Sequence, residues 1–475
     1  MNEVAVDLCV IGAGSAGLTA TAIAAQLGAK VVLIEGAKMG GECLNNGCVP
    51  SKALLAVGKA AHVMRSCAPF GIEAVEPRVD FAAVHRHVQQ VIASIAPHDS
   101  VERFTSLGAQ VIRAEARFVE PRVVTAGDSR IRARRIIIAT GSRPSTPKID
   151  GIDNVDYFTN ETIFGNTTLP EHLLIIGGGP IGIEMAQAYR RLGSRVTVIE
   201  NAKALVHDDA ALVDRLLQVL TGEGVVIRQN AKVTAVRQRG AGIVLALVEG
   251  GQHSEVEGSH LLVAAGRRPR LAALDLERAG VHASDDGIIV DAKLRTSARG
   301  VFAIGDVVAR APHFTHVAGY HAGIAVQNAL LFPYARTDYA SLPWVTYTDP
   351  ELAHIGASEE AARKQHGDGV RVLEFAMKDN DRAQTERTTV GAVKVVARRN
   401  GKVLGVSILA SHAGELAHLW VAVIASGQKL KSVARLMAPY PTQGEANKSV
   451  ASNFYKAKVF SALSRRIVRA FSHMS

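Results

Sequence analysis

The sequence has 475 residues, of which 48% are hydrophobic and 21% charged, and it contains 43 glycines. This composition is typical of an ordered α/β enzyme of roughly two to four domains and excludes a disordered or fibrous chain. Lysine and arginine outnumber the acidic residues and give a net charge of +10, which favours anionic ligands. Because only 5% of the residues are aromatic and they do not alternate with basic residues, we expect no nucleic acid partner.

The stretch from Leu8 to Ala29 contains no charged residue, but we do not expect it to span a membrane or to act as a signal peptide. Gly12, Gly14 and Gly17 interrupt its apolar run, and the acidic Asp7 stands where a signal peptide carries basic residues. The four cysteines are too few for a secreted disulfide framework. We therefore expect a soluble, cytoplasmic protein.

Two segments of the chain share the order strand, glycine turn, helix, strand. Their first strands are expected at residues 4–11 and 172–176, and both turns read Gly-x-Gly-x-x-Gly. In both, a glutamate 23 residues after the first glycine ends the second strand, where it can accept hydrogen bonds from a ribose 2′-hydroxyl. These features together predict two dinucleotide sites. The residues expected to contact the dinucleotides are Gly12, Gly14, Ser15, Ala16, Gly17 and Glu35 in the first unit, and Gly177, Gly179, Ile181, Gly182 and Glu200 in the second.

The stretch from Gly40 to Lys52 contains Cys43 and Cys48 and predicts a redox-active disulfide. A regular helix would hold residues five apart at roughly 8–9 Å between Cα atoms, beyond the reach of a disulfide, so we expect a distorted helix. Cys48 then begins the next helix, where the helix dipole and Lys52 lower a thiol pKa. The alternatives are two structural thiols or a zinc site. Zinc would need two further ligands, and we expect no metal site.

These motifs resemble those of the flavin-dependent pyridine nucleotide–disulfide oxidoreductases, which include glutathione reductase, dihydrolipoamide dehydrogenase and mercuric reductase. Both glycine turns, the segment GGECLNNGCVPSK, the turn Ala139–Gly141 and the apolar strand before Gly305-Asp306 carry the resemblance. It implies an α/β fold with two Rossmann-like dinucleotide-binding domains, one for FAD and one for NAD(P), and an α+β C-terminal dimerisation domain. The implied boundaries are 1–150 for the first FAD segment, 151–268 for the NAD(P) domain, 269–338 for a central segment that returns to FAD, and 339–475 for the dimerisation domain.

The resemblance also implies roles for individual residues and an obligate homodimer with a shared active site. Cys48 is expected to be the thiolate that touches the flavin, and Cys43 the thiol that meets the substrate. Lys52 should lie by the flavin N5 and pair with Glu184, and Asp306 should bind the flavin ribitol. Further cofactor contacts are expected at Gly41, Lys52, Thr140, Gly141, Gly266 and Gly305.

Residue 440 departs from the pattern of most of the family. Disulfide reductases and dihydrolipoamide dehydrogenases have a histidine before Pro-Thr and a glutamate downstream that orients it, whereas this chain has Tyr440 and Glu445. A phenol with a pKa near 10 is a poor base at neutral pH, where a histidine near 6.5 can exchange protons. Mercuric reductases carry tyrosine here, but their C-terminal cysteine pair has no counterpart, since no cysteine follows Cys67.

We therefore expect a mercuric-reductase-like enzyme that moves electrons between NADH, FAD, the Cys43/Cys48 pair and a disulfide, dithiol, metal-ion or quinone substrate. Glu200 favours NADH over NADPH. The alternative is a dihydrolipoamide dehydrogenase-type flavoprotein that acts on a lipoyl-carrying partner protein. A non-catalytic nucleotide sensor would not need a cysteine pair beside a lysine.

Basic and apolar residues alternate over residues 453–471 in an amphipathic pattern. Such a segment can pack on a protein partner or lie on acidic lipid. We expect a helix that packs on the protein's own dimer rather than on a membrane surface.

Overall fold

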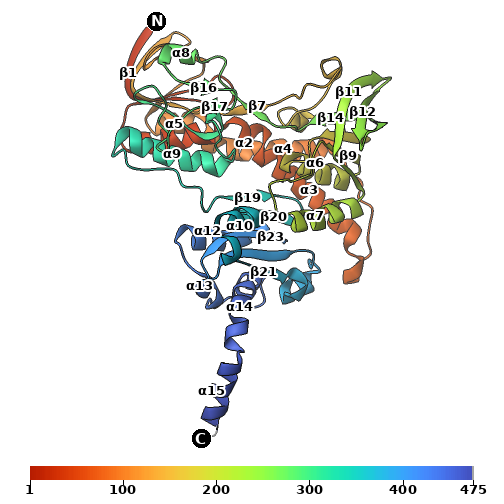
Figure 1. The fold of residues 1–475 in the computed structure, drawn as a ribbon. Coiled ribbons are helices and arrows are strands. Elements are labelled where there is room, and N and C mark those ends of the chain that lie inside the picture. The colour runs from red at the N-terminus through yellow and green to blue at the C-terminus, as the bar shows by residue number, and fades with distance from the viewer. Residues whose placement is uncertain (473–475) are drawn as a thin grey trace. The chain divides into compact units, whose positions relative to one another are not determined.

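A computed structural model describes residues 1–472, which form two compact units (Figure 1). Its mixture of parallel sheets, helices and an antiparallel sheet confirms the predicted α/β fold class. The four domain boundaries derived from the sequence remain predictions. The first unit comprises Met1–Gly177, Ala188–Ile199 and Ala231–Thr337, and the second comprises Gly178–Gln187, Glu200–Asn230 and the residues from Asp338 onward.

The largest sheet of the first unit is built around a parallel core. Its strands are, in spatial order, β3 (Ala109–Ile112), β2 (Val31–Ile34), β1 (Asn2–Ile11), β6 (Ser129–Ile138), β5 (Val123–Ala126) and β4 (Ala116–Glu120), and β18 (Val301–Ala303) pairs with the end of β6. Because β1, β2, β3, β6 and β18 run parallel, their carboxyl ends meet at one edge, where dinucleotides bind in such sheets.

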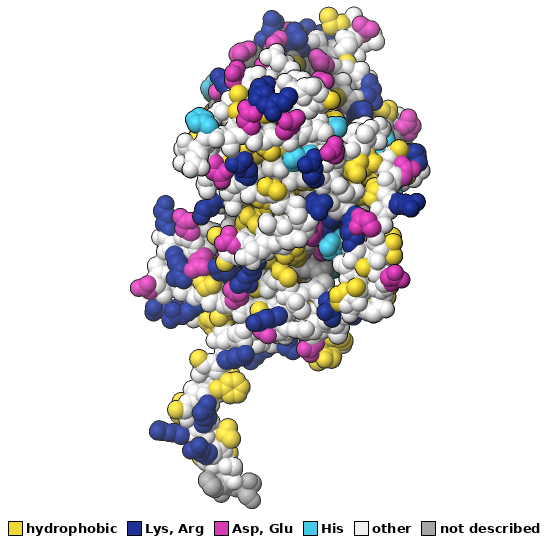
Figure 2. Space-filling model, turned by 90° about the vertical axis from the view of Figure 1, so that its right-hand side faces the viewer, with side chains coloured by type: hydrophobic (Ala, Val, Ile, Leu, Met, Phe, Trp, Pro, Cys, Tyr) yellow, Lys and Arg dark blue, Asp and Glu magenta, His cyan; other side chains and the backbone are white. Residues whose placement is uncertain are grey.

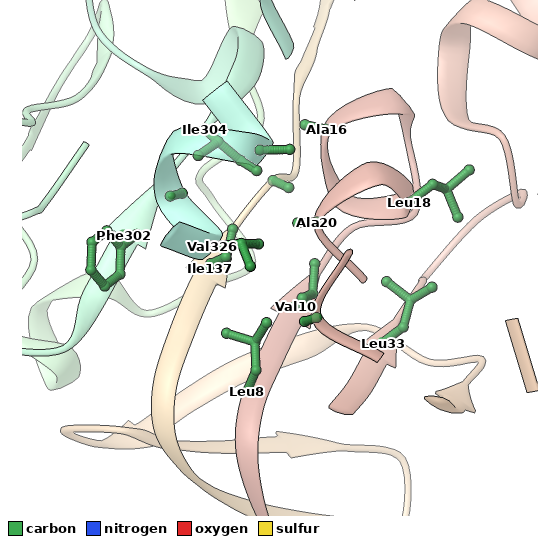
Figure 3. Packing of buried hydrophobic residues seen from close by; sticks show 14 of the residues in the cluster. Leu8, Val10, Ala16, Leu18, Ala20, Leu33, Ile137, Phe302, Ile304 and Val326 are labelled. Atoms are coloured by element: carbon green, nitrogen blue, oxygen red, sulfur yellow. The ribbon is translucent and has the colours of Figure 1, made fainter. Parts of the chain in front are cut away.

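One face of this sheet is covered by α1 (Ser15–Gln26) and α9 (Thr315–Leu330). Figure 3 shows the apolar side chains that meet there: Leu8 and Val10 of β1, Leu33 of β2, Ile137 of β6 and Phe302 of β18, with Leu18 and Ala20 of α1 and Val326 of α9. Near-continuous runs of Val, Ile and Leu are typical of parallel strands that are covered on both faces. This packing holds the carboxyl ends of the strands in place.

The second glycine motif has the same local architecture. The strands β9 (Arg195–Glu200), β8 (His172–Ile176) and β14 (His260–Val263) pair in parallel in this order, and α6 (Pro180–Leu192) follows the turn after β8. The predicted first strand at 172–176 is confirmed, and Glu200 ends the second strand, β9, as expected.

The remaining elements of the first unit are shorter or peripheral. A two-stranded ribbon of β7 (Ser142–Pro144) and β15 (Arg267–Pro269) brings two distant chain segments together. An antiparallel meander is formed by β11 (Ala231–Arg239), β12 (Gly242–Glu249) and β13 (Gln252–Gly258). The other elements are α2 (Gly41–Asn46), α3 (Cys48–Ser66), α4 (Phe81–Ile95), α5 (Val101–Ser106), α8 (Leu276–Ala279), β16 (Ala283–Ser284) and β17 (Gly287–Ile288).

The second unit contains a five-stranded antiparallel sheet. Its order is β19 (Pro343–Thr346), β20 (Glu351–Gly356), β23 (Val403–Ala410), β22 (Ala392–Arg398) and β21 (Val370–Ala376). Trp420 is fully buried against it and donates a hydrogen bond from Nε1 to Asn447 Oδ1 at 2.7 Å. The other elements are α7 (Ala210–Gly222), β10 (Val225–Gln229), α10 (Glu359–His366), α11 (Asp381–Glu386), α12 (Ala413–Ala425), α13 (Leu430–Ala434), α14 (Glu445–Val459) and α15 (Ala462–Ser472).

The first position of each motif must be glycine, because the turn there lies very close to the backbone of a neighbouring segment. Gly12 and Gly177 have φ values of +104° and +114°, which L side chains rarely adopt. A Cβ at Gly12 would lie 2.4 Å from the carbonyl oxygen of Ala139, and one at Gly177 would lie 2.4 Å from that of Ala264. The turn after each first strand therefore fits against the end of a neighbouring strand only when it carries no side chain.

We predict that Gly12→Ala lowers the free energy of unfolding much more than Gly28→Ala. Gly28 also has a positive φ of +81°, but no described atom lies within 4 Å of its Cβ position, so Gly28→Ala should cost only about 1–2 kcal/mol. Gly12→Ala adds a backbone clash and should cost about 3 kcal/mol or more. Denaturant unfolding and the FAD content of the purified proteins measure the effect. Equal losses in both variants would show that the close approach is unimportant.

Candidate active site

The two cysteines of the predicted redox pair lie on either side of a helix break. Cys43 belongs to α2, Gly47 follows with φ −135° and ψ −112°, and Cys48 is the first residue of α3. This backbone is not helical, so the predicted distortion between the cysteines is confirmed. The Cys43 thiol, which is half-buried, forms a hydrogen bond with Cys48, whose side chain is exposed. The break thus brings together two thiols that a regular helix would hold apart.

The environment of the pair distinguishes its two sulfurs. The hydrogen bond with Cys48 and burial raise the pKa of the Cys43 thiol, whereas hydrogen bonds with Thr315 and Ser15 lower it by less. Cys48 Sγ lies 3.4 Å from Thr315 Oγ1, at the start of α9. The raised pKa favours the proton on Cys43 and the negative charge on Cys48.

The start of α3 favours that negative charge. Among the described residues, no side chain caps this helix, and its first turn contains no acidic residue. The partial positive charge at a helix N-terminus stabilises a thiolate at its first position. Lys52 lies four residues on, half-buried on the same side of the helix.

The segment that carries Cys43 is tied to the loop after β18 by a polar network. Arg267 forms an ion pair with Glu42 and donates a hydrogen bond from Nε to Ser142 Oγ at 2.9 Å. The Ser142 hydroxyl donates to Asp306 Oδ2 at 2.8 Å, and Asn160 Nδ2 donates to Glu42 Oε1 at 2.6 Å. The predicted ribitol ligand Asp306 is therefore held by side chains from the β7–β15 ribbon.

A buried histidine fixes the backbone next to Asp306. His321 of α9 is fully buried, and its Nδ1 accepts a hydrogen bond from the Gly305 amide at 3.1 Å. Burial lowers the pKa of His321 to about 4, so its ring is neutral at pH 7 and able to accept this bond. His321 thus has a structural role in this loop. In residues 1–472, no group of three or more His, Cys, Asp or Glu side chains is arranged to hold a metal ion.

The glutamates at the ends of the two second strands make equivalent contacts. Glu35 accepts hydrogen bonds from the amides of Ala13 and Ala37, both at 2.6 Å. Glu200 accepts them from Gly178 at 2.7 Å and from Ala202 at 2.8 Å. Each carboxylate is held at its glycine turn, as the repeated sequence pattern predicts.

The first glycine turn fits the pyrophosphate of a dinucleotide. No side chain in the described part of the chain caps α1, so no side chain competes with a ligand for its first amides. A Cβ added at Gly41 would lie 2.6 Å from the Cα of Gly14. The backbone of Gly41 therefore lies directly against the backbone of the first glycine turn. Uncapped amides and the helix dipole favour a bound phosphate. The residues present therefore fit the dinucleotide that the sequence predicts.

The other predicted residues of the first unit surround the same edge of the sheet. Thr140 and Gly141 follow β6, and Thr140 Oγ1 donates to the carbonyl of Arg270 at 2.8 Å. Gly141 and Gly266, which precede the two ribbon strands, have positive φ values of +68° and +123°. Ala16 and Gly17 are buried in the first turn of α1, beneath the glycine turn.

Four predicted residues lie close together in the second unit, near the start of α6. Gly179 and Glu184 are at the start of α6, where Glu184 is 4% exposed and accepts a hydrogen bond from the Tyr347 amide at 2.9 Å. The expected partnership between Lys52 and Glu184 remains a prediction. Ile181 is 37% exposed, and Gly182 follows it in α6.

Tyr440 is 71% exposed, and its hydroxyl donates a hydrogen bond to Asp381 Oδ2 at 3.0 Å. This bond and the charge of Asp381 raise the pKa of the phenol above its usual value. Glu445 begins α14 and accepts a hydrogen bond from the Thr442 amide at 3.3 Å, rather than from Tyr440. The Tyr440 phenol therefore stays protonated at neutral pH, where it can donate a hydrogen bond but has almost no phenolate form to act as a base.

Several residues of the site were not predicted from the sequence. They are Glu42, Ser142, Asn160, Arg267, Thr315, His321 and Asp381. The sequence does contain a signal for Glu42. It directly precedes Cys43, and a charged residue beside a redox pair needs a partner. The others come from distant parts of the chain and carry no local signal.

Two Rossmann-like units with a thiol pair beside the first glycine turn define a class of protein, the flavin-dependent disulfide oxidoreductases. The family of pyridine nucleotide-disulphide oxidoreductases matches residues 6–322, and its dimerisation domain matches residues 342–451. The chain belongs to this family, whose members are oxidoreductases that use FAD and a pyridine nucleotide. The matched dimerisation domain supports a homodimer.

Relatives with different substrates match nearly the whole chain. A mercuric reductase of Streptomyces lividans is 36% identical over 456 residues, which cover 94% of this chain and 96% of the relative. A dihydrolipoyl dehydrogenase of Thermus scotoductus is 35% identical over 465 residues, covering 95% and 98%. The Cu(II) complex of the HOCl-induced flavoprotein disulfide reductase RclA from Escherichia coli has a TM-score of 0.85 and 26% identity, covering 95% of this chain and 100% of that one. These identities do not select one substrate.

Proposed function

We propose that the chain is an NADH-dependent reductase whose Cys43/Cys48 pair passes two electrons to a soft metal ion or a small disulfide. The observation that carries this proposal is the hydrogen-bonded thiol pair at the uncapped start of α3. When bound, FAD would take up hydride from NADH and pass the electrons to the pair. Gly12, Gly14, Gly41, Glu35 and Asp306 would hold FAD.

Within the reduced pair, the two cysteines are proposed to have separate tasks. Cys48 would hold the thiolate next to the flavin, and Lys52 would compensate its charge. Cys43 would hold the proton and meet the acceptor. This division follows from the raised pKa of Cys43 and the position of Cys48 at the first residue of a helix.

The presence of Tyr440 supports an electron acceptor whose reaction needs no protein side chain to remove a proton. A dithiol must lose protons before it is oxidised, and a phenol bound to Asp381 with a raised pKa is unsuited to remove them. A soft metal ion instead displaces thiol protons as it binds, because thiolates are its preferred ligands. The mercuric reductase relative fits this chemistry, while the dihydrolipoyl dehydrogenase relative supports the alternative, oxidation of a lipoyl group on a partner protein.

Glu200 supports NADH as the coenzyme. Its carboxylate is held at the second glycine turn by the amides of Gly178 and Ala202. There it would accept hydrogen bonds from a 2′-hydroxyl and repel a 2′-phosphate.

The first prediction concerns the cysteine pair. Cys43→Ser and Cys48→Ser should each lower NADH-dependent reduction of mercuric ion or of a small disulfide by about 100-fold or more, because two electrons need both sulfurs. In the FAD-loaded protein, a thiolate beside the flavin adds a long-wavelength absorption band, which Cys43→Ser should keep and Cys48→Ser should lose. Cys67→Ser is the matched control, since Cys67 Sγ lies 3.4 Å from the carbonyl oxygens of Met64 and Glu73. Unimpaired turnover in both pair variants would refute the assignment.

The second prediction concerns coenzyme choice. The wild-type protein should have the higher kcat/KM with NADH, and Glu200→Gln should shift the ratio toward NADPH by about tenfold, the effect of roughly 1.4 kcal/mol. Glu171→Gln removes the same charge at an exposed ion pair with Arg195 and should leave the ratio unchanged. A wild-type preference for NADPH would contradict the role of Glu200.

The third prediction separates the two candidate acceptors. Tyr440→His introduces a base with a near-neutral pKa, so NAD⁺-dependent oxidation of free dihydrolipoamide should rise by about tenfold or more if the chain lacks only the base. Tyr334→His, at a tyrosine that is 68% exposed in the other unit, serves as the control. High dihydrolipoamide activity of the wild-type protein would favour the lipoyl alternative. An unchanged rate in a folded, FAD-loaded Tyr440→His protein would mean that the missing base does not set the substrate.

A further inference from the structure

The last described helix, α15, is not packed against its own subunit. α14 buries Ala446, Asn447, Val450 and Ala451 in the second unit, but residues 456–472 are largely exposed, and none of the described residues of α15 is buried. Figure 1 shows α15 projecting away from the five-stranded sheet of its unit. The matched dimerisation domain ends at residue 451, so α15 lies beyond the matched residues.

The segment is divided into two helices rather than the single one suggested by the amphipathic pattern over residues 453–471. α14 ends at Val459, and Ser461 caps α15 by accepting a hydrogen bond from the Ser464 amide at 3.2 Å. α15 is therefore a separately capped helix.

α15 has one apolar and one basic side. With 3.6 residues per turn, Leu463, Ile467 and Phe471 align on one side, with Val468 at its margin. Leu463, Val468 and Phe471 are each 67% exposed, and Ile467 is 48% exposed. Burying such a side chain fully contributes about 1.5–3 kcal/mol of favourable free energy, so binding of this side to another surface is favourable.

The opposite side carries Arg465 and Arg469, and Arg466 lies at its margin. After Glu445 the sequence contains six lysines and arginines and no acidic residue. Figure 2 shows basic and apolar side chains side by side along the projecting helix. The charge of the whole segment is therefore uniformly positive.

We propose that α15 binds the surface of a membrane that contains anionic lipids. An amphipathic helix with a basic side lies in the plane of the interface, where its apolar side enters the acyl boundary and its arginines bind lipid phosphates. α15 has 11 residues and is about 16 Å long, too short for a hydrocarbon core of about 30 Å. Accordingly, no helix within the described chain is long and apolar enough to cross a membrane.

A second copy of the helix is a poorer occupant than anionic lipid. The expectation from the sequence was a helix that packs on the protein's own dimer. Pairing two copies of α15 would bring together two sets of three arginines without any acidic partner from the same segment. Like charges at a helix pair are destabilising, whereas anionic headgroups neutralise them.

The test is co-sedimentation of the FAD-loaded, full-length protein with lipid vesicles. The protein should sediment with vesicles of phosphatidylcholine mixed with phosphatidylglycerol, much less with phosphatidylcholine alone, and high salt should weaken the binding. Ile467→Gln with Phe471→Gln, and separately Arg465→Gln with Arg469→Gln, should each weaken binding by about tenfold or more. Ala462→Gln with Ser472→Gln, the matched control on the same helix, should bind normally. All three double variants should retain normal NADH-dependent turnover.

Other outcomes would overturn the proposal. Equal binding to both kinds of vesicle would show that anionic lipid is not recognised. If the Ile467→Gln, Phe471→Gln protein loses its dimeric state in lipid-free light scattering, a second copy covers the apolar side. If the protein binds neither kind of vesicle, lipid is excluded, and an acidic protein surface is the remaining occupant.

Discussion

Two thiols five residues apart can meet only where the helix that carries them is interrupted, and the chemistry of this protein depends on that interruption. At Gly47 the backbone leaves the helical region, so that α2 ends and α3 begins with Cys48. The same break places Cys48 at an uncapped helix N-terminus and leaves Cys43 half-buried beside it. One local feature thus creates both the sulfur pair and the difference in proton affinity between its members.

The polar network around Arg267 connects this break to the rest of the first unit. Glu42, next to Cys43, is bound by Arg267, and Arg267 reaches Asp306 through Ser142. A partly buried carboxylate without such a partner would be strongly destabilising. The network therefore gives the cysteine segment and the predicted ribitol ligand a common support, the β7–β15 ribbon, which carries both Ser142 and Arg267.

Two exposed features of the second unit bear on the proposals for this protein. Tyr440 and α15 are both solvent-accessible, and each departs from the expected family pattern, one by replacing a histidine and the other by extending beyond the matched domain. Asp381 holds the Tyr440 hydroxyl and raises its pKa, so the replacement removes a base rather than substituting another. Tyr440 therefore bears on the proposed electron acceptor, and α15 on the proposed membrane binding, whereas electron transfer is proposed to depend on the cysteine pair of the first unit.

The sequence alone determined the features that arise from residues close together in the chain. The turns after Ile11 and Ile176 and the separation of Cys43 from Cys48 are local, because backbone sterics and helix geometry act over a few residues. Only the tertiary structure decided which distant groups meet: Arg267 with Glu42, the Gly305 amide with His321, and Tyr440 with Asp381. It also decided that α15 buries nothing in its subunit, although an amphipathic pattern looks the same whether its apolar side faces protein or solvent. Such pairings depend on strand order and helix packing, which long-range burial sets and short motifs do not encode.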